Sequence, residues 1–329
     1  MHKYAVLKSV LLASFLTLQT AIQPLVVRKL VPRDSISSAC ILVTEILKVI
    51  TCVLIYYFLE HRYHPKKSWV KLSSLKTSVS TAAVPAIVYA LQNIAITHAQ
   101  RNLDGLTYNI INQSKLLSAA VMSYLVLGRK QNRGQSIALF GLVVASGMAV
   151  VSTSASTSIS SFESNTWAGL VAALTASGLS GLSGALSDKA LQVRSRNSFL
   201  FSAELSSYVI LTMLIGLTVE YISNPNHCDV TRIVSAGGLF SAAGITSTTS
   251  AVLIPISLGA FGGILVGQVT KLVGNVRKGF AVCGGIVVAA LIDSLREDST
   301  GGPLLFFSIP LAVLAVASHG WFSGQISKK

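Results

Sequence analysis

The chain has 329 residues, of which 51% are hydrophobic and only 12% are charged, about half the charged fraction of ordinary soluble domains. This composition excludes a soluble fold. The net charge of +14 comes without the RNP, zinc-finger or arginine-rich patterns of nucleic-acid-binding proteins. We therefore predict an all-α polytopic membrane protein that binds no nucleic acid.

Apolar windows of about 19 residues, the length that crosses a bilayer, predict ten membrane-spanning helices. They lie near residues 8–27, 36–59, 79–98, 105–127, 135–152, 166–187, 199–222, 250–270, 274–295 and 303–322. The first stretch follows Lys3 and Lys8 as a signal peptide would, but it runs on to Arg28 without a small-x-small cleavage site, so we expect a retained helix. Residues 233–249 are rich in Gly, Ser and Thr, and we assign them to a long loop between the seventh and eighth spans.

The polar stretch at 153–165 divides the predicted spans into five before it and five after it. An odd number of spans in each half means that a duplicated half inserts upside down, which is the inverted-repeat plan of many secondary transporters. We expect one half over residues 1–152, a non-cytosolic linker at 153–165 and a second half over 166–329. Limited internal similarity between residues 89–110 and 259–280 agrees with this division.

The basic residues between the spans predict the orientation. With ten spans, both termini face the same side, and the connections on that side, such as residues 60–78, carry most of the Lys and Arg. The positive-inside rule then places both termini in the cytosol. A basic cluster at Arg28, Lys29 and Arg33 lies on the opposite side and runs against this bias.

No motif for an enzyme or an ATP-driven pump is present. The four cysteines lie apart and form neither a disulfide framework nor a CxxC metal site. Walker A, HExxH and GxSxG motifs are also missing from the sequence. We therefore expect no catalytic residue, no metal and no cofactor.

Two segments carry small residues at helical spacing. Gly178, Gly181 and Gly184 are three residues apart, and Gly263 and Gly267 are four apart. Small faces let helix backbones approach each other closely. We expect static packing at most of these glycines and moving gate surfaces at the others.

The fourth predicted span contains a charge in an unusual place. Lys115 is its eleventh residue, too deep to reach either membrane interface easily. On a continuous helix, Tyr108, Asn112 and Lys115 share one face, which suits an anionic ligand with rings and hydroxyls. The alternative is a buried ion pair between Lys115 and Glu45 or Glu204 of another span.

Other charges in the predicted spans have structural and functional interpretations. Glu45 and Lys48 are three residues apart and can neutralise each other along one helix. Lys278 opens the ninth span as either an interface anchor or a second buried cation, and Glu204 is expected to be paired or hydrogen-bonded. Two lysines with few deep carboxylates favour a phosphorylated ligand. The residues therefore predict a secondary transporter of phosphorylated solutes, with a non-transporting scaffold and a membrane-embedded glycosyltransferase as alternatives.

Several motifs resemble the nucleotide-sugar transporter family, in the drug/metabolite transporter superfamily. They are TEILK (44–48), YALQN (89–93), LDGLTYNIINQSK (103–115), SGLSGLSGALSDK (177–189) and GGILVGQVTKLVGNVRKGF (262–280). The branch of the CMP-sialic acid, UDP-galactose and UDP-N-acetylglucosamine transporters is the most similar. Within it, TLQTAIQPL (17–25) resembles the plant type that carries UDP-N-acetylglucosamine and UDP-N-acetylgalactosamine.

The resemblance implies ten helices in two inverted five-helix halves, in a Golgi or endoplasmic reticulum membrane. It further implies exchange of a cytosolic nucleotide sugar for a lumenal nucleoside monophosphate. The partners it implies are these two ligands and the lipid bilayer, and we keep a homodimer open as an assembly.

The resemblance also implies roles for individual residues. It places Lys115 and Lys278 at the phosphates, Tyr108 in the nucleotide pocket, Gln92 and Asn93 in the third span of the site, and Glu45 and Lys48 near the sugar. The chain departs from the family at Asn112, where relatives often have tyrosine, and at Ser202 and Glu204, where relatives carry an Arg-Asn-x-Gln string. These departures favour a UDP-N-acetylhexosamine over CMP-sialic acid.

Overall fold

The computed structural model describes residues 2–32, 35–63, 78–103, 105–153, 165–225, 228–245, 250–296 and 303–326. All regular structure within these residues is helical. The linker predicted at 153–165 lies outside them except for its two end residues.

Long helices dominate the described chain. They are α1 (His2–Leu30), α2 (Ser37–Tyr63), α4 (Val84–Asn102), α7 (Arg133–Thr153), α8 (Asn165–Asp188), α9 (Ser198–Ser223), α12 (Leu253–Val273), α13 (Asn275–Arg296) and α14 (Pro303–Ile326). The shorter elements are α5 (Gly105–Asn112), α6 (Lys115–Leu127), α10 (Asp229–Ser235), α11 (Leu239–Ala242), η1 (Val79–Ala83), η2 (Lys189–Val193) and η3 (Ser250–Val252).

The described residues contain nine candidate membrane spans, each of which overlaps a predicted one. The remaining prediction, at 303–322, falls on α14, whose described apolar stretch Phe306–His319 is shorter than a full span. The chain is therefore a multi-pass helical membrane protein.

The fourth span is interrupted, so the continuous helix expected across 105–127 is wrong. Helix α5 ends at Asn112, residues 113 and 114 form a turn, and α6 begins at Lys115. In the turn, the backbone N–H of Ser114 donates to the carbonyl of Ile111 at 2.9 Å. The Gln113 amide donates back to the carbonyl of Asn109 at 3.3 Å. The backbone bonds of Gln113 and Ser114 therefore have i→i−3 spacing, which tightens the helix locally. The single candidate span Thr107–Leu127 consists of two helices.

The loop expected at 233–249 has more structure than the sequence indicates. Its described part contains the end of α10 and all of α11, joined through Gly237 and Gly238 at φ values of 90° and 111°. The carbonyl of Ala242 accepts a hydrogen bond from the Ile36 N–H at 2.9 Å. This contact ties the connection to the start of α2.

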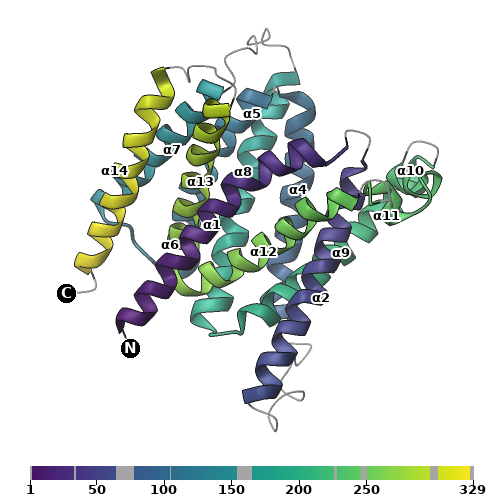
Figure 1. Ribbon diagram of the computed structural model, residues 1–329, viewed down its shortest axis with the longest axis horizontal. Coiled ribbons are helices and arrows are strands. Elements are labelled where there is room, and N and C mark those ends of the chain that lie inside the picture. Colours follow the sequence, from purple (N-terminus) through teal and green to yellow (C-terminus); the bar gives the residue numbers. More distant parts are fainter. Residues whose placement is uncertain are drawn as a thin grey trace.

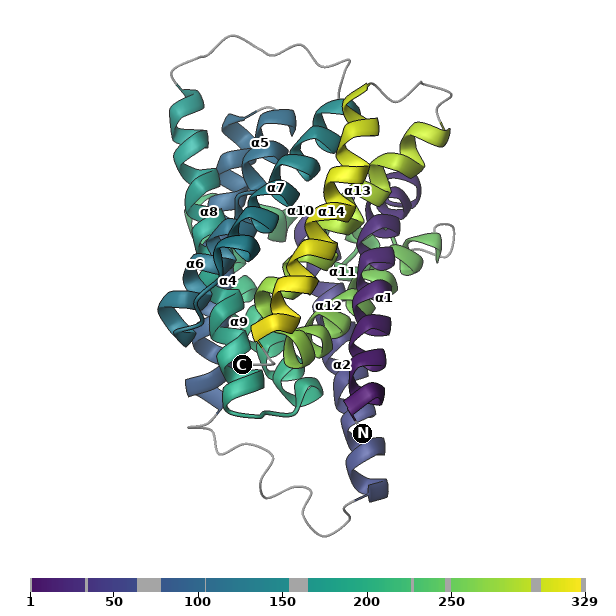
Figure 2. The ribbon, with the colours of Figure 1, turned by 90° about the vertical axis from the view of Figure 1, so that its left-hand side faces the viewer.

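The helices of the two predicted halves interleave in one bundle (Figures 1 and 2). Helix α4 packs mainly on α8, α7 on α14, α2 on α9, and α1 on both α12 and α13. The outer ends of α1 and α14 lie toward the same end of the bundle (Figure 1).

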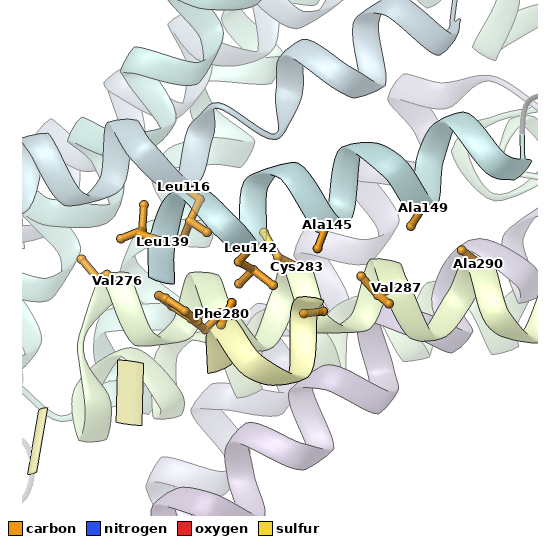
Figure 3. Packing of buried hydrophobic residues seen from close by; sticks show 12 residues of the cluster. Leu116, Leu139, Leu142, Ala145, Ala149, Val276, Phe280, Cys283, Val287 and Ala290 are labelled. Carbon is orange, nitrogen blue, oxygen red and sulfur yellow. The ribbon is translucent and has the colours of Figure 1, made fainter. Parts of the chain in front are cut away.

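A buried cluster of apolar side chains joins α6, α7, α13 and α14 (Figure 3). Its members include Leu116, Leu142, Phe280 and Cys283. Leu116 follows Lys115 directly in the sequence, so the packing of this cluster sets the position of the lysine backbone.

The glycines of α8 let its backbone approach two neighbouring helices. A Cβ at Gly181 would lie 2.5 Å from the carbonyl carbon of Ser118 in α6, and a Cβ at Gly184 would overlap the side chain of Asn275 in α13. Gly178 has open space around it. The predicted close packing is therefore confirmed at Gly181 and Gly184 but not at Gly178.

A matched pair of substitutions tests this packing. Gly181→Ala should destabilise the protein by about 1–3 kcal/mol, because the new methyl group meets backbone that cannot move aside. Gly178→Ala, one turn earlier on the same helix, should change stability by less than about 0.5 kcal/mol. Thermal unfolding of the purified protein in detergent measures both. Equal melting temperatures for the two variants would contradict the packing of α8 on α6.

Candidate functional site

The two predicted phosphate-binding lysines lie at the contact between α6 and α13. Gly279 of α13 is packed against the side chain of Leu116, where a Cβ would overlap it. One turn further along α13, the Cys283 Sγ lies 3.9 Å from the Gln113 Oε1. These contacts flank Lys115 and Lys278, and Lys278 interacts electrostatically with Asp188 as well as with Lys115.

The carboxylates expected as alternative partners of Lys115 are both occupied by other cations. Glu45 pairs with Lys48 at 2.7 Å, and Glu204 pairs with Arg196 at 2.6 Å. Within the described ranges, no ion pair forms on Lys115. The structure therefore does not support the ion-pair alternative for this lysine.

Lys115 has no carboxylate partner among the described residues, whereas Lys278 interacts electrostatically with Asp188. Each ammonium group loses hydration when it leaves water, and the two like charges also repel each other. An anion placed between Lys115 and Lys278 would remove both penalties. A bound anion is one arrangement that would offset the charge of Lys115.

The Glu45–Lys48 ion pair lies where α2 meets α12. Both side chains are 14% exposed, and the Lys48 stem packs on Gly263, where a Cβ would come within 2.8 Å of its Cδ. The predicted pairing is confirmed. Glu45 Oε2 is buried and has no hydrogen-bond partner in the described part of the chain, so this carboxylate keeps an acceptor for a polar group.

Gln92 and Asn93 lie on α4 but face different surroundings. Asn93 lines a cavity of about 920 Å³ between α2, α4, α9 and α10, at the upper end of the volume range of small-ligand pockets. The side-chain oxygen of Gln92 is buried without a hydrogen-bond partner among the described residues. Lys115 and Lys278 do not line this cavity, so the structure separates the Asn93 surface from the lysine pair.

Tyr108 and Asn112 do not extend the lysine face as a continuous helix would. Tyr108 is 8% exposed and packs in a cluster with Ala99, Leu103 and Ala173. Asn112 is half-buried at the last position of α5. The turn between α5 and α6 therefore changes the direction of this face between Asn112 and Lys115.

The predicted residues of α9 contact neighbouring helices. Ser202 is 5% exposed and packs on Gly267 of α12. The Glu204 ion pair joins a wider network, because Arg196 also donates to the Thr81 hydroxyl at 2.9 Å. The two charged side chains are only about one-tenth exposed, so this network ties the start of α9 to η1.

One residue that sequence reasoning missed is Asp188, at the end of α8. Its Oδ2 accepts a hydrogen bond from the Asn275 backbone N–H at 2.9 Å and lies 3.4 Å from the Arg129 guanidinium. Asp188 therefore caps the N-terminus of α13, the helix that carries Lys278. Aspartate is a preferred cap, but here the cap lies 87 residues before the helix it stabilises, so no local motif reveals it.

The fold defines a class, a multi-pass helical membrane protein, and within the described residues Lys115 has no ion-pair partner. Comparison with known families identifies the family within this class. The family model described as nucleotide-sugar transporter matches residues 3–318. The chain belongs to the nucleotide-sugar transporter family, and the resemblance seen in its motifs is confirmed.

Relatives and a solved structure agree with this assignment. The chain is 32% identical to the UDP-N-acetylglucosamine transporter ROCK1 of Arabidopsis thaliana over 92% of its own length and 89% of the relative. It is 27% identical to the human UDP-N-acetylglucosamine transporter, over 87% and 85%, and 30% identical to the mouse UDP-galactose translocator, over 86% and 73%. One crystal structure shares the fold, with a TM-score of 0.64 and 10% identity over 96% of this chain and 98% of the other.

Removing one partner of the buried ion pair tests its structural role. Arg196→Ala should destabilise the protein by about 3–5 kcal/mol, because Glu204 remains buried without its counter-charge. Arg194→Ala is the control, since Arg194 is exposed and makes only longer hydrogen bonds, to Ser80. Thermal unfolding should separate the two variants clearly. Similar melting temperatures would mean that the ion pair contributes little.

Proposed function

We propose that this chain is an antiporter that imports a UDP-sugar into the Golgi or endoplasmic reticulum lumen. UDP-N-acetylglucosamine and UDP-N-acetylgalactosamine are the proposed substrates, and the nucleoside monophosphate left by glycosyl transfer is the counter-substrate. The observation that carries the proposal is Lys115, which lies within a candidate span and forms no ion pair among the described residues, on a helix that packs against the one carrying Lys278. Family membership and the UDP-N-acetylglucosamine transporters among the relatives support the choice of cargo.

The lysine pair matches the charge of both proposed ligands. The diphosphate of a nucleotide sugar and the phosphate of a nucleoside monophosphate each carry close to two negative charges near pH 7. Exchange of one for the other is therefore nearly electroneutral. The membrane potential, worth about 2.3 kcal/mol per charge per 100 mV, then does little work on the cycle.

The same charge balance gives a reason for obligatory exchange. Without an anion, Lys115 and Lys278 repel each other, and closing the bundle around them would remove both from water. A bound diphosphate or monophosphate cancels this repulsion and stabilises the occluded state. Loaded carriers therefore reorient, whereas empty carriers do so slowly, because only a ligand that favours the occluded state can shift the population toward it.

The remaining polar residues supply contacts for the base and the sugar. The free acceptors on Glu45 and Gln92 suit hydroxyl and amide donors, which an N-acetylhexosamine and a uracil both carry. Lys48 and Asn93 add donors on the same two helices. Tyr108, Asn112, Ser202 and Glu204 are proposed to line the path in other states of the cycle.

Ten spans in two inverted halves complete the proposal, and the helix contacts support it. Suppose that α1, α2, α4, α5 with α6, and α7 correspond in order to α8, α9, α12, α13 and α14. The contact of α4 with α8 then matches that of α12 with α1, and the contact of α6 with α8 matches that of α13 with α1. The junction of α4 with α5 also corresponds to that of α12 with α13, and both are only one or two residues long.

The proposed orientation places both termini in the cytosol. The connections between α6 and α7 and between α8 and α9 lie toward the end of the bundle that holds the outer ends of α1 and α14 (Figure 2). Both connections are basic, as the cytosolic side requires. Every residue proposed to contact the ligand comes from one chain, so the same mechanism operates in a monomer or a homodimer.

A UDP-galactose or CMP-sialic acid carrier and a non-transporting scaffold are the other candidates. The mouse UDP-galactose translocator is 30% identical, which favours a UDP-linked sugar over a CMP-linked one. A scaffold has no need for Lys115, because leucine at that position would remove the desolvation penalty.

Substitution of Lys115 tests the site directly. Lys115→Met should reduce uptake at least about 100-fold while the ligand-free protein keeps or gains thermal stability, because it removes an uncompensated buried charge. Lys189→Met is the control, because Lys189 is an exposed cation elsewhere on the chain and its loss should leave uptake unchanged. Uptake by Lys115→Met at the wild-type rate would assign this lysine a purely structural role.

Counter-flow in reconstituted vesicles tests the exchange. Proteoliposomes preloaded with UMP should take up labelled UDP-N-acetylglucosamine at least about ten times faster than empty ones, because only loaded carriers return readily. Unlabelled UDP-N-acetylgalactosamine should compete with this uptake, and CMP-sialic acid should not. Equal uptake by empty and preloaded vesicles would rule out obligatory exchange.

A further inference from the structure

A second cavity lies beside the helix that carries Lys278, and we call it the junction cavity. Its volume is about 410 Å³, and it is formed by the α6–α7 connection, the end of α8 and the junction of α12 with α13. Residues that line it include Arg129, Lys130, Arg277, Asp188, Asn275 and His319. Neither Lys115 nor Lys278 lines it, so it is separate from the lysine pair.

The charges of the junction cavity are mostly positive. Arg129, Lys130 and Arg277 are all exposed, so solvent and ions can reach them, whereas Asp188 is the one carboxylate on the described lining. A concave surface lined by one sign of charge concentrates ions of the opposite sign. The cavity is therefore suited to an anion that arrives from the aqueous side.

The Asp188 carboxylate occupies the position at which such an anion would bind. It is 1% exposed, its Oδ2 caps α13 at the Asn275 N–H, and its distance to Arg129 is a long 3.4 Å. A helix N-terminus and an arginine guanidinium both favour phosphate, which offers them more acceptor oxygens and more negative charge than one carboxylate does. A diphosphate can therefore displace Asp188 from these donors.

Two buried polar atoms of the lining lack partners. Asp188 Oδ1 and Asn275 Nδ2 make no hydrogen bond within the described ranges, although Asn275 is only 2% exposed. An anion supplies an acceptor for the Asn275 amide. Between these groups, Gly274 adopts φ of 86°, and an added Cβ would lie 3.1 Å from Asp188 and 3.4 Å from Arg129. The absence of a side chain there keeps the donors accessible to a ligand.

We infer that the junction cavity is a second anion site, which receives the diphosphate of the cytosolic ligand before it reaches Lys115 and Lys278. This inference rests on the proposed function for the direction of travel. Arg129, Lys130 and Arg277 bind the diphosphate first. Displacement of Asp188 then breaks its hydrogen bond to the start of α13, the helix that carries Lys278. Arrival of the ligand therefore loosens the closed end of the bundle.

Inorganic pyrophosphate is the probe, and the full-length chain is purified with Lys115→Met and Lys278→Met to remove the deeper site. Pyrophosphate should still raise the melting temperature of this double variant in detergent. Adding Arg129→Gln and Arg277→Gln should raise the pyrophosphate concentration at half-effect at least tenfold. Adding Arg133→Gln instead should not change it, because Arg133 is exposed at the first position of α7 and does not line the cavity.

A milder variant covers the case in which the combined variants do not fold. Lys130→Gln in the otherwise wild-type chain removes one exposed cation and should raise the half-effect concentration for inhibition of exchange by external pyrophosphate at least threefold. Arg133→Gln is again the control.

Three outcomes would overturn the inference. The first is loss of all pyrophosphate stabilisation in the Lys115 and Lys278 variant. The second is an unchanged response after the Arg129 and Arg277 substitutions. The third is stabilisation by vesicles of anionic lipid without any effect of pyrophosphate, which would assign the cavity to lipid headgroups. Wild-type exchange continues in all three cases, whereas failure of the proposed function is seen as a lack of wild-type exchange.

Discussion

The charge of Lys115, which lies within a candidate span and has no ion-pair partner among the described residues, is the constraint on which the rest of the structure depends. An isolated cation within a span costs about 2.5–3.5 kcal/mol, and helix packing must hold it in place against that cost. Leu116 packed on Gly279 and Gly181 packed on the backbone of Ser118 supply this restraint. Apolar packing thus keeps positive charge at this position without a counter-charge, and a bound anion neutralises it.

The carboxylates of the described chain pair with cations other than Lys115 and so leave its charge without a partner. Glu45 is neutralised by Lys48 on its own helix, Glu204 by Arg196 and Asp188 by Arg129. The Asp188–Arg129 pair ties the end of α8 to the α6–α7 connection, and the Arg196 bond to Thr81 ties the start of α9 to η1, whereas the cavity of about 920 Å³ lies beside Asn93. A transporter that alternates between two openings must break contacts of this kind, so ion pairs that are weak or displaceable are suited to the closed end.

Much of the fold and part of the site could be predicted from sequence, because bilayer thickness imposes a simple length rule. Nine predicted spans match helices, and the pairing of Glu45 with Lys48 follows from their spacing along one helix. The break after Asn112 could not be predicted by hydropathy, which averages over the polar turn at Gln113. The Asp188 cap could not be predicted either, because it caps a helix that begins 87 residues later.

The amino-acid sequence by itself determined the membrane class, the positions and order of the nine apolar segments that form candidate spans, and the family, because these follow from composition and short motifs along one chain. The tertiary structure alone decided which carboxylate pairs with which cation, and therefore that Lys115 has no counter-charge in the described bundle. It also decided that Tyr108 packs against α4 and α8. Coulomb energies depend on distances between helices, and those distances are set by glycine contacts such as Gly181 with Ser118 that no local pattern encodes.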